Sequence, residues 1–349
     1  MIEKKNIKVD PKLLKFINNE VLNGLDILEE DFWNGVSDIV DIYFPKNNDL
    51  LDKRKHLQNK IDKWHSQNKS KDINLDDYKS FLKEINYIVE EGPDFKITTS
   101  NVDKEISTIC GPQLVVPITN ARFALNAVNA RWGSLYDALY GTDVLGDVPD
   151  TKSYDPIRGD KVVEFAKLHL DKFAPLINAK WNEVNSIKLN GNKIVLNGLN
   201  NININFKDNN QIIGWRMGKD SKLKELILSK NNLHCRILID PKDDVGKKDP
   251  ANISDIIVES AVSTVLDCED SVATIDCEDK ILAYRNWLGL IKGDLEVEFQ
   301  KNNKIFTRKL CKDISYTTTD HQEKLLKGRS LMLIRNVGHL MTTPAILTK

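Results

Sequence analysis

Charged side chains directly follow two of the most apolar runs of this sequence. Asp267, Glu269 and Asp270 come after one run, and Arg335 comes after another. A guanidinium can hold a small carboxylate through two hydrogen bonds, while carboxylates handle protons or hold Mg²⁺ and its water molecules. This arrangement fits a site for a small anionic substrate. It also fits a salt bridge between neighbouring strands. The amino-acid composition does not indicate which reaction such a site would catalyse.

The runs that precede these charges have the pattern of strands buried on both faces. They cover residues 261–266 and 330–334, and a third run covers 114–118. Continuous apolar runs of this length are typical of parallel sheets. The first of the three, in chain order, leads into a predicted helix over 120–127, with Thr119 as its cap. Because ligands bind at the C-terminal ends of parallel strands, the sequence predicts an α/β architecture with its site there.

Other candidate residues carry weaker signals. Arg122 and Arg131 lie on the predicted helix after the first strand, where Arg122 in the first turn can receive a phosphate or simply face solvent. His339 stands four residues after Arg335 and receives no role. Ser271 lacks a GxSxG context, and the sequence has no GxGxxG or P-loop motif. A cysteine and carboxylate metal site at 267–270 is disfavoured, since zinc sites use paired Cys or His.

The remaining segments divide the chain by periodicity. Residues 1 to about 90 are predicted helical, with one segment stopping at Pro45 and others following over 50–64 and 78–88. Asn190-Gly191 and Asn197-Gly198 predict hairpins in a β-containing region. Further helices are expected over 160–173 and over 276–290, the latter with a capping box at its start and Gly293 at its end.

Composition excludes several classes of protein. The 349 residues carry 50 Lys and Arg against 51 Asp and Glu, which does not favour a general binder of nucleic acid or of anionic membranes. No window reaches about 18 consecutive apolar residues, and the N-terminus lacks a signal-peptide pattern, so a cytoplasmic protein is expected. The five cysteines are dispersed without a CxxC pair and are predicted to be free thiols.

Several long stretches closely resemble malate synthase G. One is Pro117-Ile118-Thr119-Asn120-Ala121-Arg122-Phe123 with its surroundings, and another is Asp267-Cys268-Glu269-Asp270-Ser271. The matching stretches occur in the right order over 113–127, 130–143, 267–273, 278–280, 284–290, 328–332 and 334–342. Weaker similarity extends over essentially the whole chain.

The resemblance implies a transferase of the glyoxylate bypass, linked to the tricarboxylic acid cycle. Acetyl-CoA and glyoxylate condense in a Claisen reaction, and hydrolysis gives malate and CoA, with Mg²⁺ as cofactor. The implied partners are these two substrates, without nucleic acid or membrane, and the full-length protein is expected to be a cytoplasmic monomer.

The implied fold is a TIM (β/α)8 barrel with an N-terminal helical clasp and an inserted α/β domain, of which this chain holds the first three barrel strands. The clasp is expected over 1–85, a linker over 86–112, and the first strand and helix over 113–131. The inserted domain follows over 132–260 and the second barrel unit over 261–292. A return excursion into the inserted domain is expected over 293–329, and the third strand over 330–349.

The resemblance also implies site roles, position by position. Arg335 matches the active-site arginine that binds glyoxylate and stabilises the enolate. Asp267 and Glu269 match carboxylates near the metal, and Glu269 is expected to hold a water molecule bound to it. The positions that match the acetyl-CoA site are Val115, Arg122, Phe123, Ser271 and Arg308.

The sequence departs from the family in length. Family members are about twice as long, and the direct Mg²⁺ ligands and the catalytic aspartate are expected beyond residue 349, so none is assigned here. A fragment, a frameshift or half of a split gene would give this pattern, and the chain alone is expected to be inactive or prone to aggregation. Alternative interpretations are a non-catalytic acetyl-CoA-binding module and another Mg²⁺-dependent acyl-CoA lyase.

Overall fold

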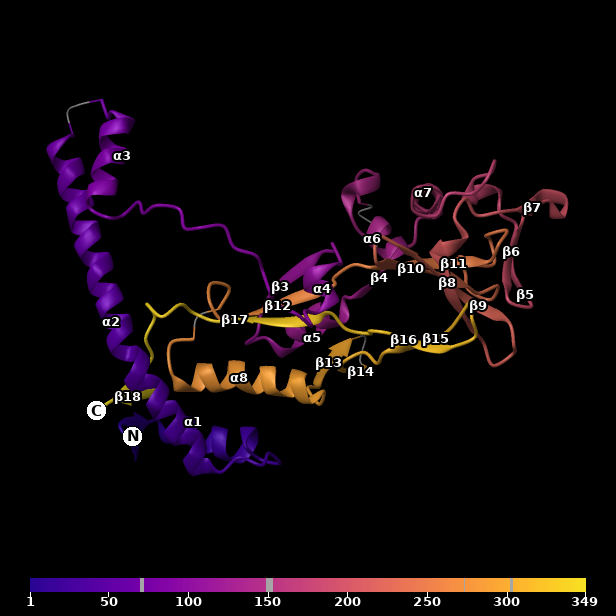
Figure 1. Cartoon of the computed structure of the whole chain (residues 1–349). Helices are drawn as coiled ribbons and strands as arrows, with labels where there is room; N and C mark the ends of the chain where they lie inside the picture. Colours follow the sequence, from indigo (N-terminus) through magenta and orange to yellow (C-terminus); the bar gives the residue numbers. More distant parts are fainter. Residues whose placement is uncertain (70–71, 149–152, 273, 302–303) are drawn as a thin grey trace. The chain divides into compact units, whose positions relative to one another are not determined.

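The computed structural model divides the chain into two compact units (Figure 1). It describes residues 1–69, 72–148, 153–272, 274–301 and 304–349. The first unit comprises Met1–Asn101, Ala273–Leu288 and Asn336–Lys349, and the second comprises Val102–Val272 and Gly289–Arg335.

The first unit joins both ends of the chain in one small core. Its sheet has the antiparallel order β1-β2-β18, and its buried side chains come from β2, α1, α2, α8 and the residue before β18. Its elements are β1 (Ile2–Lys4), β2 (Ile7–Val9), α1 (Pro11–Phe16), the π-helix η1 (Ile17–Val21), α2 (Glu29–Gln67), α3 (Leu75–Glu84), most of α8 (Cys277–Lys292) and β18 (Ile346–Thr348). The prediction of helix from residue 1 onward was therefore wrong for the first nine residues.

The expected break at Pro45 was also wrong, because α2 runs through it as one helix of 39 residues. Proline lacks an N–H group and cannot bond the carbonyl of Asp41. Both residues are exposed, so water can satisfy that carbonyl. The third helix, in contrast, ends early: α3 stops at Glu84, and Asn86 adopts a positive φ of 58°.

The second unit contains the parallel sheet that the apolar runs predicted. Its order is β17-β12-β3, and both strand pairs are parallel. The strands are β3 (Gln113–Pro117), β12 (Ser263–Asp267) and β17 (Leu331–Arg335), and they lie side by side in Figure 1. The helix after β3 is α5 (Ala121–Asn129), but its cap is Asn120 rather than Thr119, since the Asn120 side chain accepts a hydrogen bond from the Phe123 N–H.

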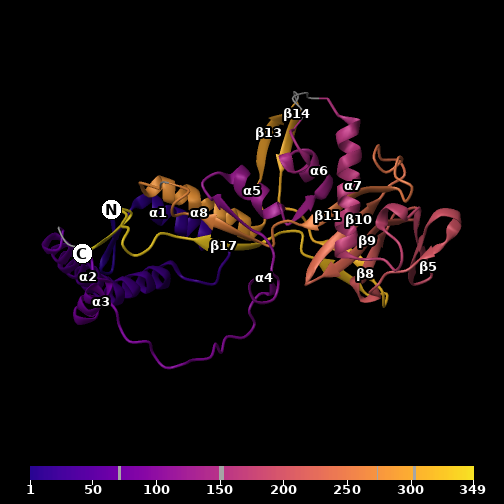
Figure 2. The same ribbon diagram turned by 90° about the horizontal axis from the view of Figure 1, so that it is seen from above.

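The second unit also contains a larger antiparallel sheet of seven strands. Its order is β16-β15-β8-β9-β10-β11-β4, and α7 (Pro156–Phe173) lies beside it (Figure 2). Val162, Ala166 and Leu170 of α7 share one buried core with side chains of β9 and β10. The seven strands are β4 (Trp132–Ser134), β8 (Ile212–Met217), β9 (Leu223–Lys230), β10 (Leu233–Ile239), β11 (Ile253–Glu259), β15 (Ile314–Thr318) and β16 (Glu323–Leu326).

Smaller elements complete this unit. The hairpin predicted at Asn190-Gly191 is confirmed, because Asn190 pairs with Lys193 and Gly191 has a positive φ of 57°. The turn expected at Asn197-Gly198 is instead a longer connection through η4. These elements are α4 (Lys104–Ser107), α6 (Leu135–Tyr140), η2 (Asp143–Leu145), η3 (Trp181–Glu183), β5 (Ser186–Asn190), β6 (Lys193–Asn197), η4 (Leu199–Asn201), β7 (Asn203–Ile204), η5 (Asn209–Gln211), β13 (Val297–Lys301) and β14 (Lys304–Arg308).

Helix boundaries differ from the predicted ones by a few residues. Helix α7 begins at Pro156 because the Asp155 side chain accepts hydrogen bonds from the N–H groups of Ile157 and Arg158. At the start of α8, the Asp276 side chain accepts from the Asp279 N–H, whereas the Asp279 carboxylate accepts from Ile275 rather than completing a capping box. No helix in the described ranges is long and apolar enough to cross a bilayer.

Candidate active site

The parallel register brings Asp267 and Arg335 together at the C-terminal ends of β12 and β17. These two residues are direct partners across the strands. Arg335 Nε lies 2.8 Å from Asp267 Oδ1, and Nη2 lies 2.9 Å from Oδ2. The sequence predicted this proximity, because strands that run in parallel end at the same edge of a sheet.

Asp267 is held by the loop that follows it as well as by Arg335. Its side chain is fully buried. Oδ1 accepts a hydrogen bond from the Glu269 N–H at 2.9 Å, and Oδ2 accepts one from the Ser271 N–H at 2.8 Å. The hydrogen bonds from Arg335 hold the pKa of Asp267 well below its usual range, although burial opposes them. Asp267 is therefore an anion at neutral pH and cannot serve there as a proton donor.

Arg335 faces two further carboxylates and solvent. Glu269 Oε2 lies 3.5 Å from its Nε, and Asp270 forms a close ion pair with Nη2. Its side chain is 40% exposed, and among the described residues Nη1 donates no hydrogen bond. The arrangement leaves one edge of a fixed guanidinium available to a carboxylate or an oxyanion.

Three carboxylates here have oxygen atoms close enough to share a cation. One oxygen each of Asp267, Glu269 and Asp270 lies within 4.8 Å of the others. Both oxygens of Asp267 already accept two hydrogen bonds each, so Asp267 does not fit a direct Mg²⁺ ligand. Glu269 is 44% exposed and fits a group that accepts a hydrogen bond from a metal-bound water.

Two of the predicted acetyl-CoA residues meet at an aromatic ring that sequence reasoning missed. The guanidinium carbon of Arg122 lies 4.6 Å from the centre of the Phe299 ring, and that of Arg308 lies 5.6 Å from it. Phe299 in β13 also stacks on Phe306 in β14, at 5.8 Å between ring centres. Two short segments with apolar residues, 297–299 and 305–306, flank the polar run 300–304, and this pattern was a signal for the hairpin.

The other predicted acetyl-CoA residues are exposed. Val115 on β3 and Phe123 on α5 are 56% and 52% exposed, and Ser271 is exposed beside Asp267. Among the described residues, no hydrogen bond or ion pair joins Arg122 or Arg308 to the group around Arg335. Arg308 Nε is buried and has no hydrogen-bond partner in the described part of the chain.

Comparison with known proteins identifies two regions of the chain. Residues 12–70 match the family model described as the malate synthase N-terminal domain, and residues 154–230 match the α/β insertion domain of malate synthase G.

Three relatives named malate synthase G match nearly the whole chain. The protein of Halalkalibacterium halodurans is 45% identical over 99% of this chain and 48% of its own length. Those of Corynebacterium glutamicum and Corynebacterium efficiens are 44% and 43% identical, each over 98% of this chain and 46% of its own length. The chain is a homologue of malate synthase G, and it spans about half the length of these curated relatives.

Proposed function

We propose that this chain supplies the glyoxylate-binding and acetyl-CoA-binding part of a malate synthase. The reaction is the condensation of acetyl-CoA with glyoxylate, followed by hydrolysis to malate and CoA. The observation that carries the proposal is the Arg335 guanidinium, fixed by a buried carboxylate and still 40% exposed at the end of a parallel strand.

Arg335 has two tasks in this proposal. Its available edge binds the carboxylate of glyoxylate, and its fixed positive charge stabilises the enolate oxygen that develops as the thioester loses a methyl proton. Arg335 cannot take that proton, since it stays protonated, and its bonds to Asp267 raise its pKa further. The base is therefore a residue outside the Arg335 and Asp267 pair.

The acetyl-CoA moiety is assigned to residues on β3, α5, the loop after β12, and β14. Arg122 and Arg308 offer two cations beside the Phe299 ring, which suits the phosphates and the base of a nucleotide. Val115, Phe123 and Ser271 complete the assigned set. All five roles rest on the matching positions in the family.

Mg²⁺ would polarise the aldehyde of glyoxylate when it is bound. Glu269 fits a role in holding its water. Direct metal ligands are not assigned within residues 1–349, and neither is the base.

The fold proposal is that β3, β12 and β17 are the first three strands of a TIM barrel. The parallel pairing of all three supports it. The proposed division is the clasp over 1–85, the linker over 86–112, barrel units from 113, 261 and 330, and the inserted domain over 132–260 with its return over 293–329. The pairing of β15 with β8 supports that return. We also propose a cytoplasmic monomer.

The test is release of CoA from acetyl-CoA and glyoxylate in the presence of Mg²⁺. Residues 1–349 alone are expected to show no turnover. The same residues joined to the remaining half of the Halalkalibacterium halodurans relative are expected to release CoA. Turnover by residues 1–349 alone at the rate of a full-length enzyme would contradict the proposed division of the site.

A second candidate function is binding of acetyl-CoA without turnover. The two arginines beside Phe299 favour this second function, because both cations and the aromatic ring belong to residues 1–349. Calorimetry with acetyl-CoA on residues 1–349 would detect binding, and a joined protein that binds but releases no CoA would favour this function over the first.

A further inference from the structure

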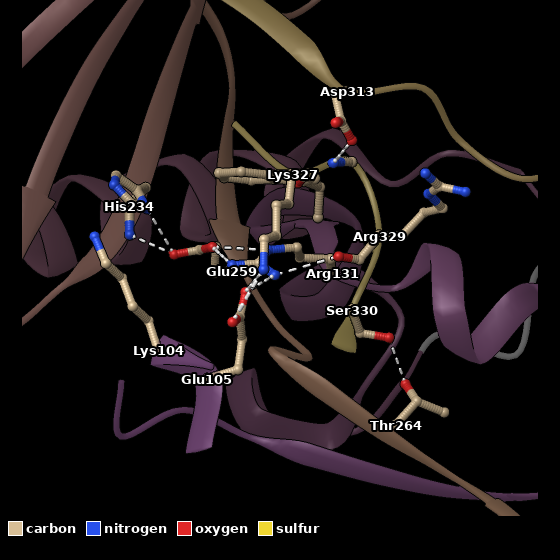
Figure 3. Close-up of polar contacts among 12 residues, drawn as sticks. Lys104, Glu105, Arg131, His234, Glu259, Thr264, Asp313, Lys327, Arg329 and Ser330 are labelled. Carbon is tan, nitrogen blue, oxygen red and sulfur yellow. Dashed lines mark hydrogen bonds and ion pairs between the residues drawn. The ribbon is translucent and has the colours of Figure 1, made fainter. Parts of the chain in front are cut away.

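Arg131 lies buried at a meeting point of three chain segments (Figure 3). Its side chain is 4% exposed. Nε and Nη2 lie 2.9 Å and 2.8 Å from Glu259 Oε1, and Nη1 lies 2.8 Å from Glu105 Oε1. Nη1 also donates to the main-chain carbonyl of Arg329 at 3.2 Å. The expectation that Arg131 lies on the helix was wrong, because α5 ends at Asn129.

The three partners of Arg131 precede the three parallel strands. Glu105 belongs to α4, the element before β3. Glu259 ends β11, the element before β12, and Arg329 stands two residues before the start of β17. The Arg131 side chain therefore bonds to the segment that precedes each of the three strands.

The two carboxylates around Arg131 are charged in the folded chain. Burial by itself raises the pKa of Glu105, but hydrogen bonds from Arg131 and Lys327 outweigh it and lower this pKa to about 2. The pKa of Glu259 is also lowered despite its burial, because His234 donates to its Oε2 and Arg131 lies beside it. Arg131 thus bonds to two anions that are shielded from water, where such bonds are strongest.

Neutral hydrogen bonds also restrain the start of β17, including those from the Leu331 N–H to the Val262 carbonyl at 2.9 Å and from Trp132 Nε1 to the Lys327 carbonyl at 2.8 Å. Arg131 adds a buried, charged contact to them. Ser330 Oγ lies 2.6 Å from Thr264 Oγ1, and the Ser330 N–H donates to the Val128 carbonyl at 3.0 Å. Strand β17 lies at the edge of its sheet with β12 as its one neighbour there. A slip of one residue in a strand turns every side chain to the other face, and would carry Arg335 away from Asp267.

We infer that Arg131 is a positioning residue, which fixes the register of β17 on β12 and thereby places Arg335 against Asp267. It acts from the N-terminal ends of the strands, opposite the proposed site. The link from this placement to glyoxylate turnover rests on the proposed function, whereas the placement itself does not.

The experiment compares Arg131→Met with the triple variant Arg131→Met, Glu105→Gln, Glu259→Gln. The triple variant removes the buried charges together, which avoids leaving carboxylates unpaired. Arg216→Met is the matched control, because Arg216 pairs with Glu225 inside the seven-stranded sheet. Among the described residues, it forms no hydrogen bond or ion pair with Glu105, Glu259 or Arg329.

Two readouts report the position of β17 without substrate. One is the nuclear magnetic resonance signal of the Arg335 Nε–H, which bonds to Asp267. The other is hydrogen exchange at the amides of Leu331 and Cys268, which bond to Val262 and Arg335 across the two strands. Both Arg131 variants are expected to lose the Arg335 signal at its parent position and to exchange these amides at least tenfold faster. Arg216→Met is expected to change neither.

A folded Arg131→Met or triple variant with the parent Arg335 signal and parent exchange rates would overturn the inference. So would an Arg131→Met variant that also loses the protection of β8 and β9, because Arg131 would then be a general stabiliser of the unit. Since neither readout needs turnover, a joined protein that releases no CoA would count against the proposed function and leave this result standing.

Discussion

Asp267 accepts hydrogen bonds from Arg335 and from two backbone N–H groups while lying fully out of water. This environment fixes both the charge of the carboxylate and its direction. The guanidinium is fixed in turn, so that Nη1 projects from a rigid support. A side chain held in this way loses little conformational entropy when it binds a substrate.

Asp267→Asn is predicted to destabilise the second unit by about 2 kcal/mol, because an amide cannot accept from Arg335 on both sides. Urea unfolding measures the change. Asp270→Asn is the matched control, since Asp270 is 67% exposed and such surface pairs contribute about 0–1 kcal/mol. Equal stability of the Asp267 and Asp270 variants would contradict the role given to Asp267.

The low pKa of Glu105 predicts a loss of stability in acid. Its pKa is about 2 in the folded chain against 4.5 in the unfolded one. The stabilisation is therefore complete above pH 4.5 and is lost as the pH falls towards 2, by on the order of 3 kcal/mol.

Urea midpoints between pH 6 and pH 3 test this prediction. Glu105→Gln is expected to be less stable at pH 6 and to depend less on pH. Glu298→Gln, at an exposed position in the same unit, is expected to keep the dependence of the parent. An unchanged pH dependence in Glu105→Gln would count against the prediction.

The sequence predicted that Asp267 and Arg335 meet, but it did not predict the partners of Arg131, and the reason is physical. A charge after a continuous apolar run has a local signature, because the run and the charge are adjacent in sequence. The partners of Arg131 lie 26, 128 and 198 residues away. Nothing local indicates that such distant segments converge.

Helices and strands show the same contrast between features with a local sequence pattern and features that depend on distant segments. The strands β3, β12 and β17 were predictable, since each contains a continuous apolar run. The expected burial on both faces holds for β12 and was wrong for the other two, because β17 is half-buried and β3 is exposed at Leu114 and Val115. The hairpin of β1 and β2 was not, because strands of three residues carry too little pattern, and their partner β18 comes from the other end of the chain. The continuity of α2 through Pro45 was missed for a further reason: exposure to water reduces the cost of a lost helical hydrogen bond.

Ala345→Glu is predicted to open the sheet of the first unit. Ala345 is 3% exposed in the core beside Ile7 and Val9, and its carbonyl accepts from the Asp10 N–H at 2.9 Å. A charge placed there would lie in an apolar core, at an expected loss of more than about 2 kcal/mol.

Hydrogen exchange at the amides of β2 measures this opening. Leu347→Glu is the matched control, since Leu347 is 45% exposed two residues further along, and it is expected to keep the exchange rates of the parent. Parent-like exchange in Ala345→Glu would show that β18 does not support the first unit.

At the scale of the whole molecule, the chain matches two domain models from malate synthases and spans about half of the length of its relatives. Its parallel sheet has three strands, and both edge strands carry partly exposed apolar side chains. Parallel sheets are normally covered on both faces. The proposed barrel would provide that cover, together with the base and the metal ligands that the site requires.

The central claim is that Arg335 binds glyoxylate and stabilises the enolate. It is tested most directly by CoA release from the joined protein carrying Arg335→Lys, with Arg216→Lys as the control. The predicted result is a loss of at least about 100-fold for the Arg335 variant, as for removal of one oxyanion donor, and parent activity for the control. Parent activity in Arg335→Lys would contradict the claim.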